Sequence, residues 1–247
     1  VGTNGTSSIM LALTALKEIG KRCALVVTPT YFSTLNLLDQ LDYEVVEYSL
    51  SIKNNFKIDV DKIEHIAQHS DIDIIIITNP IFGSGIELDT ETIKGISSIC
   101  NTYGICFVMD YIYGGMPWEA LNPYYYIFNY PVYQAVCKTN QHVFVESISK
   151  RIFLNGAKFA LVFSSPDLMR RILRLSVFMV GSMASQQVNL IPQIYSHVSL
   201  LALSDMIATN AAIACERFKL IKIILADQDV YVSKANCGYF VILSIPN

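Results

Sequence analysis

The stretch "IDIIIIT" at residues 72–78 is the longest apolar run of the strand type in the sequence. A run of β-branched residues without polar alternation predicts a strand that is buried on both faces. Such strands belong to parallel sheets that helices cover on each side. The run is too short to cross a bilayer, so we interpret it as part of a protein core.

The segments on either side of this run alternate between strand-like and helix-like patterns. Continuous apolar strands are expected at 23–28, 43–49, 105–110, 142–147 and 159–164. Helical spacing of apolar residues is found at 6–20, 31–41, 61–68 and 90–104, and again from 166 to about 227. This order predicts an α/β fold, a three-layer αβα arrangement with a mostly parallel central sheet.

Two segments interrupt the alternation. The tyrosine-rich "NPYYYIFNYPVY" at 122–133 is expected to be a loop, and buried packing is favoured over a binding surface. The segment "GYFVILSI" at 238–245 has the pattern of a strand. We therefore expect a large domain over 1–225 and the incomplete beginning of a small α+β C-terminal domain over 226–247.

Composition excludes several classes of protein. The chain has 247 residues, 52% of them apolar and 16% charged, which argues against disorder. A net charge of -3 without a basic block gives no footprint for nucleic acid or an anionic membrane. The six cysteines form no CxxC pair and the four histidines are scattered, so buried thiols of a reducing, cytoplasmic compartment are favoured over disulfides or a metal. The chain begins within a motif-like stretch and without methionine, so we expect both ends of the protein to be missing.

Polar residues follow the expected strands at four places, in "VVTPTY", "IITNP", "FVMDYIY" and "VESISK". The carboxyl ends of parallel strands meet at one edge of a sheet, where ligands of such folds bind. We therefore expect these residues to form a single site.

Each candidate in this site has an ordinary explanation when taken alone. Asp110 could cap a turn, Lys150 could be a surface lysine, and the small residues at 2–8 could simply begin a helix. Together with the rings of Tyr31 and Tyr113, they form the set that holds pyridoxal phosphate. In that set a helix N-terminus binds the phosphate, an acid faces the ring nitrogen, and a lysine forms a Schiff base with the aldehyde.

The ordered motifs of the chain resemble those of fold type I pyridoxal phosphate enzymes, specifically the class I/II aminotransferase family. The most specific match is "SISK" followed after five residues by "GAKFA", which is similar to S-x-[SA]-K and G-x-R-x-G. "MDYIY" resembles D-E-I-Y, "TPTY" resembles the segment that stacks on the ring, and "TNGTSS" resembles the phosphate turn. The resemblance covers roughly residues 2–165 by motif and the remainder by general pattern.

The resemblance implies a role for each matched residue. Lys150 is then the Schiff-base lysine, Asp110 the partner of the pyridine nitrogen, and Tyr113 a donor to the ring hydroxyl. The remaining cofactor contacts that it implies are Gly5, Thr6, Ser7, Tyr31, Asn79, Ser147, Ser149 and Lys158.

The chain departs from the family pattern at several positions. Lys158 stands where the family has an arginine, so the charge remains but the bidentate fork is lost. In "NPIFGSG" the second asparagine of N-P-x-N-P-T-G becomes Phe82, and Asn79 could replace it only if the loop shifts. The second glycine of G-x-R-x-G, two residues after the arginine position, is Ala160. The arginine that usually binds the substrate carboxylate would lie beyond Asn247.

The function implied by the resemblance is an aminotransferase that acts on an amino acid and a 2-oxo acid, as a homodimer with a shared active site. One alternative is elimination, decarboxylation or cyclisation of an amino acid in specialised metabolism, which Phe82 and Lys158 motivate. Another is the aminotransferase-like sensor domain of a transcription regulator. A nucleotide-binding Rossmann domain is disfavoured, because "GTNGTSS" lacks the G-x-G-x-x-G spacing.

Overall fold

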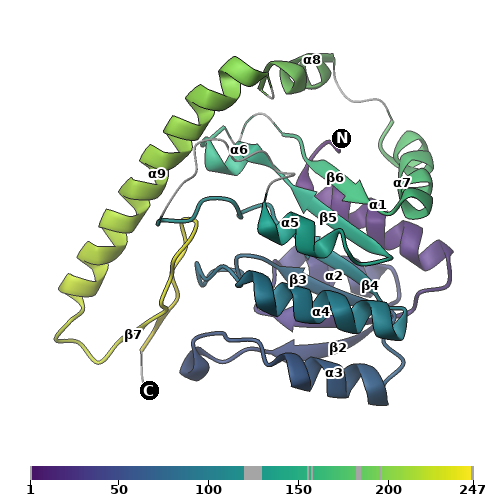
Figure 1. Cartoon of the computed structure of the whole chain (residues 1–247), viewed down its shortest axis with the longest axis horizontal. Helices are drawn as coiled ribbons and strands as arrows, with labels where there is room; N and C mark the ends of the chain where they lie inside the picture. The colour runs from purple at the N-terminus through teal and green to yellow at the C-terminus, as the bar shows by residue number, and fades with distance from the viewer. Residues whose placement is uncertain are drawn as a thin grey trace.

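A computed structural model of the chain describes residues 2–119, 130–154, 156, 158–181, 185–194 and 196–245. It confirms the α/β prediction, with helices on both faces of one six-stranded sheet (Figure 1). The strands of the sheet are β1 (Cys23–Thr28), β2 (Glu44–Ser49), β3 (Ile74–Thr78), β4 (Cys106–Asp110), β5 (His142–Glu146) and β6 (Leu161–Ser164). Their spatial order is β2-β1-β3-β4-β5-β6, and only the β5–β6 pair is antiparallel.

The helices follow the expected alternation along the chain. The first part contains α1 (Gly5–Glu18), α2 (Phe32–Gln40), the 3-10 turn η1 (Ile52–Asn54), α3 (Val60–His69) and α4 (Thr90–Tyr103). The second part contains α5 (Pro131–Val136), α6 (Ile148–Arg151), α7 (Pro166–Met179), α8 (Ser185–Ile194) and α9 (His197–Ile224). None of these helices has the length and apolar character that a membrane span requires, within the described part of the chain.

The isoleucine run of β3 explains why both faces of the sheet are covered. Ile75 and Ile77 belong to the core cluster that also contains buried residues of α3, α4 and α5. Ile74 and Ile76 point to the other face and join the cluster formed with α1, α2 and α7. All four are essentially inaccessible to solvent, so the run buries its side chains in alternation on two cores.

The last described segment differs from the prediction for 238–245. Only Leu243–Ser244 forms a strand there, β8, which pairs antiparallel with β7 (Tyr231–Val232). Residues before β8 form other backbone hydrogen bonds instead. The N–H of Cys237 donates to the carbonyl of Gly85, and the N–H of Gly238 donates to the carbonyl of Met116. A strand over the whole segment was therefore wrong.

The predicted loop at 122–133 is only partly within the described residues, since 122–129 lie outside them. Its last three residues begin α5, with Pro131 at the first turn. Tyr130 and Val132 are buried in the core beside the sheet. At this end of the segment, the packing interpretation is correct and the loop interpretation is wrong.

Candidate active site

The carboxyl ends of four parallel strands meet at one edge of the sheet, as the sequence predicts. Thr78 at the end of β3 is in register with Asp110 at the end of β4. Asp110 is in turn in register with Val145, one residue before the end of β5. A cavity of about 580 Å³ lies at this edge and is bordered by the beginnings of α1, α2 and α6.

The cavity brings together all but one of the predicted site residues. Its lining includes Gly5, Thr6, Ser7, Tyr31, Asp110, Tyr113, Ser147, Ser149, Lys150 and Lys158. These residues come from segments spread over most of the first 160 positions, and only the topology of the sheet makes them neighbours.

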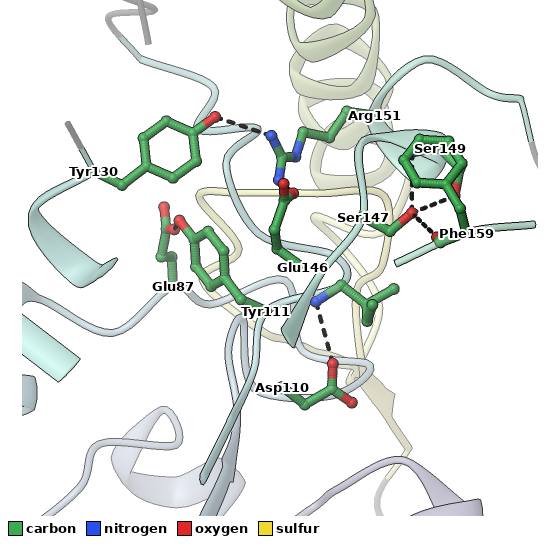
Figure 2. Close-up of polar contacts among 10 residues, drawn as sticks. Glu87, Asp110, Tyr111, Tyr130, Glu146, Ser147, Ser149, Arg151 and Phe159 are labelled. Carbon is green, nitrogen blue, oxygen red and sulfur yellow. Dashed lines mark hydrogen bonds and ion pairs between the residues drawn. The ribbon is translucent and has the colours of Figure 1, made fainter. Parts of the chain in front are cut away.

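Asp110 is a buried carboxylate without a cationic partner among the described residues. Its side chain is 6% exposed and accepts one hydrogen bond, from the backbone N–H of Ile112 at 3.1 Å (Figure 2). Burial raises the pKa of Asp110 to about 6, and the hydrogen bond from Ile112 offsets only part of this effect. A cation placed in the cavity would therefore be strongly favoured beside this group.

Lys150 lies in the wall of the same cavity. Its ammonium is 5.4 Å from the ring centroid of Tyr113. Burial lowers the pKa of Lys150, and the positive charge of Lys158 lowers it further. The pKa of Tyr113 is raised, first by burial and then by the nearby Tyr31 and Asp110. Lys150 is thus closer to being a neutral amine than an ordinary lysine.

The N-terminus of α1 forms another wall. Asn4 caps this helix by accepting from the backbone N–H of Ser7 at 2.9 Å, and its own N–H donates to the Ser7 hydroxyl at 3.2 Å. A side chain at Gly5 would approach Ile112 to 2.8 Å, so glycine lets the helix start close to the strand end. The N–H groups at a helix start and the helix dipole favour an anion at this wall.

Backbone pairing links this wall to the segment that carries Lys158. Gly2 and Ala160 form an antiparallel bridge, with hydrogen bonds of 2.7 and 2.9 Å between their backbone groups. The anion-binding wall and Lys158 are therefore joined although they are far apart in the sequence.

The two predicted serines hold the turn before Lys150. The Ser147 hydroxyl donates to the carbonyl of Phe159 at 2.8 Å and lies 2.7 Å from the hydroxyl of Ser149 (Figure 2). It also accepts from the backbone N–H of Ser149, which makes Ser147 the N-cap of the short α6. Both serine hydroxyls thus already take part in hydrogen bonds within the protein.

Asn79 is the predicted site residue that does not line the cavity. Its side-chain oxygen accepts from the backbone N–H of Leu88 at 2.9 Å, and its backbone N–H donates to the carbonyl of Asp110 at 2.8 Å. Phe82 packs against Tyr31 at 5.4 Å and Phe240 at 6.2 Å between ring centroids. The oxygen of the Asn79 amide is thus used within the loop, whereas its buried amide nitrogen has no hydrogen-bond partner among the described residues.

Sequence reasoning assigned no role to several residues at this site. Asn4 lines the cavity as the cap of α1, and Tyr239 donates a hydrogen bond to the carbonyl of Lys150. Glu146 and Arg151 form a buried ion pair on either side of the Lys150 turn. Asn4 carried a usable signal, since asparagine before a glycine and a run of hydroxyl residues is typical of a helix cap.

The residues of the cavity fit the cofactor that the motifs suggest. An unpaired buried carboxylate at one wall suits a protonated ring nitrogen. A helix start and Lys158 suit a phosphate at another wall. Lys150 lines the same cavity and offers an amine of lowered pKa, which is the group that an aldehyde needs.

A family model described as aminotransferase class I and II matches residues 1–247. The 1-aminocyclopropane-1-carboxylate synthase 1 of Prunus mume is 26% identical over 218 residues, which is 86% of this chain and 43% of that protein. A probable aspartate aminotransferase of Methanocaldococcus jannaschii is 22% identical over 169 residues, which is 68% of this chain and 41% of that protein. The chain thus spans less than half the length of these curated relatives.

Solved structures of aspartate aminotransferases share the fold. One from Rhodobacter sphaeroides has a TM-score of 0.81 at 19% sequence identity. The match covers 100% of this chain and 60% of the Rhodobacter sphaeroides chain. A single mutant of the Thermus thermophilus enzyme has a TM-score of 0.82 at 13% sequence identity. The match covers 98% of this chain and 60% of the Thermus thermophilus chain. At this level of identity the likeness establishes the architecture.

Proposed function

The chain belongs to the aminotransferase class I and II family, and we propose that its protein is a pyridoxal-phosphate-dependent enzyme that transfers an amino group from an amino acid to a 2-oxo acid. One observation carries the proposal: a single cavity contains the buried carboxylate of Asp110 and the amine of Lys150. Burial shifts both pKa values toward the neutral form of each group, which suits them to a ligand that brings its own charges.

Different residues of the cavity would bind different parts of the cofactor. Asp110 would pair with the ring nitrogen, and the Tyr113 hydroxyl would donate to the ring oxygen. The ring of Tyr31 would stack on the cofactor. The phosphate would be held by the start of α1 at Gly5, Thr6 and Ser7, by Ser147 and Ser149, and by Lys158.

Pyridoxal phosphate, when bound, supplies an aldehyde that forms a Schiff base with an amine and a ring that draws electrons from the substrate's α carbon. The chain supplies the proton transfers. Lys150, with its pKa lowered by burial, is the base that takes a proton from the substrate's α carbon once its amine is free. Asp110 keeps the positive charge on the ring nitrogen, because a buried carboxylate is most stable beside a cation.

The full protein is proposed to extend beyond this chain and to act in the cytoplasm. Residues 226–247 would open the small C-terminal domain, and a second copy of the protein would complete the active site as a homodimer. Exposed apolar side chains on α7 and α9, among them Val177, Phe178, Ile223 and Ile224, offer surface that further protein could cover. Sedimentation of the full-length protein tests the dimer.

The experiment for the cofactor uses the lysine itself. Full-length protein is mixed with pyridoxal phosphate, reduced with borohydride and digested, and the modified peptide is identified by mass spectrometry. The label is expected on Lys150 and absent from Lys150→Ala, with the visible absorbance of the lysine-bound cofactor lost as well. Lys158→Ala serves as the control, because it leaves the amine of residue 150 in place. Label on another lysine in the wild type would contradict the proposal.

The reaction is tested separately from the cofactor. Amino acids are incubated with the cofactor-loaded protein and 2-oxoglutarate, and glutamate formation is measured. Glutamate supports amino transfer. Release of CO2, of an eliminated side-chain group or of a cyclic amino acid, without glutamate, would instead indicate decarboxylation, elimination or cyclisation, respectively.

A further inference from the structure

Two residues that flank the Lys150 turn in the sequence form a buried ion pair. The guanidinium of Arg151 contacts the carboxylate of Glu146, and their side chains are 5% and 0% exposed. Figure 2 shows the two groups facing each other on the side of the turn away from Ser149. Neither residue is among those that line the cavity.

The two charges bracket the segment that carries the lysine. Glu146 is the last residue of β5 and Arg151 is the last residue of α6. Between them, Ser147, Ser149 and Lys150 all line the cavity. The ion pair therefore joins the two ends of this turn across its buried side.

Arg151 is itself fixed from two further directions. Its guanidinium donates to the Tyr130 hydroxyl at 3.0 Å and lies 5.5 Å from the centre of that ring. Its backbone carbonyl accepts from the side-chain amide of Asn210 at 3.1 Å. Tyr130 belongs to the main core, so the guanidinium connects the turn to a rigid part of the fold.

The need for such a connection follows from the length of α6. A helix of four residues, Ile148–Arg151, is too short to be stable by its own hydrogen bonds. Burying two charges costs desolvation, so an apolar pair of similar size could support stability equally well. What a charged pair adds is a fixed direction and distance between the two chain segments.

We propose that Glu146 and Arg151 are positioning residues that hold the Lys150 turn against β5 and so set where the lysine amine lies in the cavity. This inference rests on the proposed function, because it takes Lys150 as the amine that binds the cofactor. The two residues act through the backbone of the turn.

The test replaces the pair in the full-length protein. The double variant Glu146→Leu with Arg151→Met removes both charges and keeps similar volumes, whereas each single variant removes only one member of the ion pair. The matched control is Glu18→Leu with Arg174→Met, which removes an exposed ion pair at 2.6 Å between α1 and α7. Urea unfolding reports whether each variant folds.

Two readouts then follow Lys150 itself. In the cofactor-free protein, the pH dependence of its acetylation by acetic anhydride is measured by mass spectrometry of the peptide. In the presence of pyridoxal phosphate, the rate of borohydride-trapped labelling is measured. In the folded double variant, we expect the acetylation profile to move upward by about one pH unit, because the amine gains water. We expect trapping to slow about tenfold or more, because the amine is misplaced, and the control pair to match the wild type.

A second variant covers the case in which the double variant does not fold. Glu146→Gln keeps the shape and a hydrogen-bond acceptor, and we expect it to change both readouts in the same direction by a smaller amount. Wild-type readouts in the folded double variant, or in Glu146→Gln if the double variant is unfolded, would overturn the inference. Absence of trapping in the wild type would overturn the proposed function instead, while the acetylation profile would still test the positioning role.

Discussion

The hydroxyl of Tyr239 donates a hydrogen bond to the backbone carbonyl of Lys150, although 89 positions separate them in the sequence. The ring of Tyr239 also packs edge-on against Tyr113, with centroids 6.5 Å apart, and lies 5.2 Å from Phe153. The segment after α9 therefore contacts both the lysine turn and the aromatic wall of the cavity.

Replacing Tyr239 by phenylalanine should weaken the hold on this turn. The ring contacts remain and one hydrogen bond is lost, which should lower the free energy of unfolding by about 1 kcal/mol. Tyr231→Phe is the control, because it removes a similar bond, to the Asn55 side chain at 3.0 Å, away from the cavity. Urea unfolding should show comparable losses, and only Tyr239→Phe should slow cofactor trapping. Equal trapping in the two variants would contradict the contact's role.

Asp110→Asn should stabilise the cofactor-free protein at pH 8. The pKa of this carboxyl is raised from 3.8 to about 6 by burial, so above pH 6 the folded state holds an ionised group that it disfavours. A shift of this size corresponds to roughly 3 kcal/mol. The native state binds more protons than the unfolded state between these pKa values, so stability falls as pH rises from about 4 to 6 and then stays level.

The gain from Asp110→Asn should therefore depend on pH. It should be near its full size at pH 8 and small at about pH 3.5, where the wild-type carboxyl is largely protonated in both the native and the unfolded state. Urea unfolding at both pH values measures it. The same variant should bind pyridoxal phosphate more weakly at pH 8, because the carboxylate is gone. Destabilisation by the asparagine at pH 8 would show that this carboxylate has a partner.

Lys158→Ala should weaken cofactor binding without preventing covalent trapping at Lys150. A charge-assisted hydrogen bond contributes about 1.5 to 3 kcal/mol, or roughly a 10- to 100-fold change in affinity. Lys158→Arg should bind at least as tightly as the wild type, since arginine adds a bidentate fork. Lys94→Ala, on the exposed face of α4, is the control. Fluorescence titration gives the affinities, and unchanged binding in Lys158→Ala would place the phosphate elsewhere.

Gly85→Ala should disturb the packing of the last segment. Both Gly83 and Gly85 have positive φ, so alanine at either costs about 1 to 2 kcal/mol in backbone strain. At Gly85 the new methyl would also lie 2.2 Å from the Phe240 carbonyl, whereas at Gly83 its nearest neighbours are atoms of Ile242 at 3.8 Å. Overpacking adds about 1 to 3 kcal/mol, so thermal unfolding should show a clearly larger loss for Gly85→Ala.

The sequence predicts most of the cavity because strand ends carry their own signal. Asp110 is the last residue of an apolar strand, and Lys150 lies in the turn that follows another such strand. Parallel strands bring such positions together without any detail of packing. Asn79 follows the same pattern but does not line the cavity. Its amide oxygen accepts from the backbone of Leu88, a contact that depends on the path of the following loop.

The Glu146–Arg151 pair and Tyr239 could not be predicted in this way. A spacing of five residues is not that of a helical ion pair, and charged residues are ordinarily exposed. The only signal for Glu146 is a carboxylate at the end of an otherwise apolar strand. Tyr239 contacts Lys150 from a segment with a strand-like pattern, and the neighbouring Cys237 and Gly238 donate their backbone N–H groups to Gly85 and Met116, contacts that the pattern does not predict.

The bridge between Gly2 and Ala160 has a consequence for synthesis on the ribosome. The segment that carries Gly2 is translated long before its β partner, which does not exist until residue 160 has been added. Contacts of such long sequence separation form late, and nascent chains that wait for them expose apolar surface to chaperones. A nascent chain that is stalled before residue 160 should therefore remain sensitive to protease around α1. A chain that is released after residue 160 has been translated should be protected there.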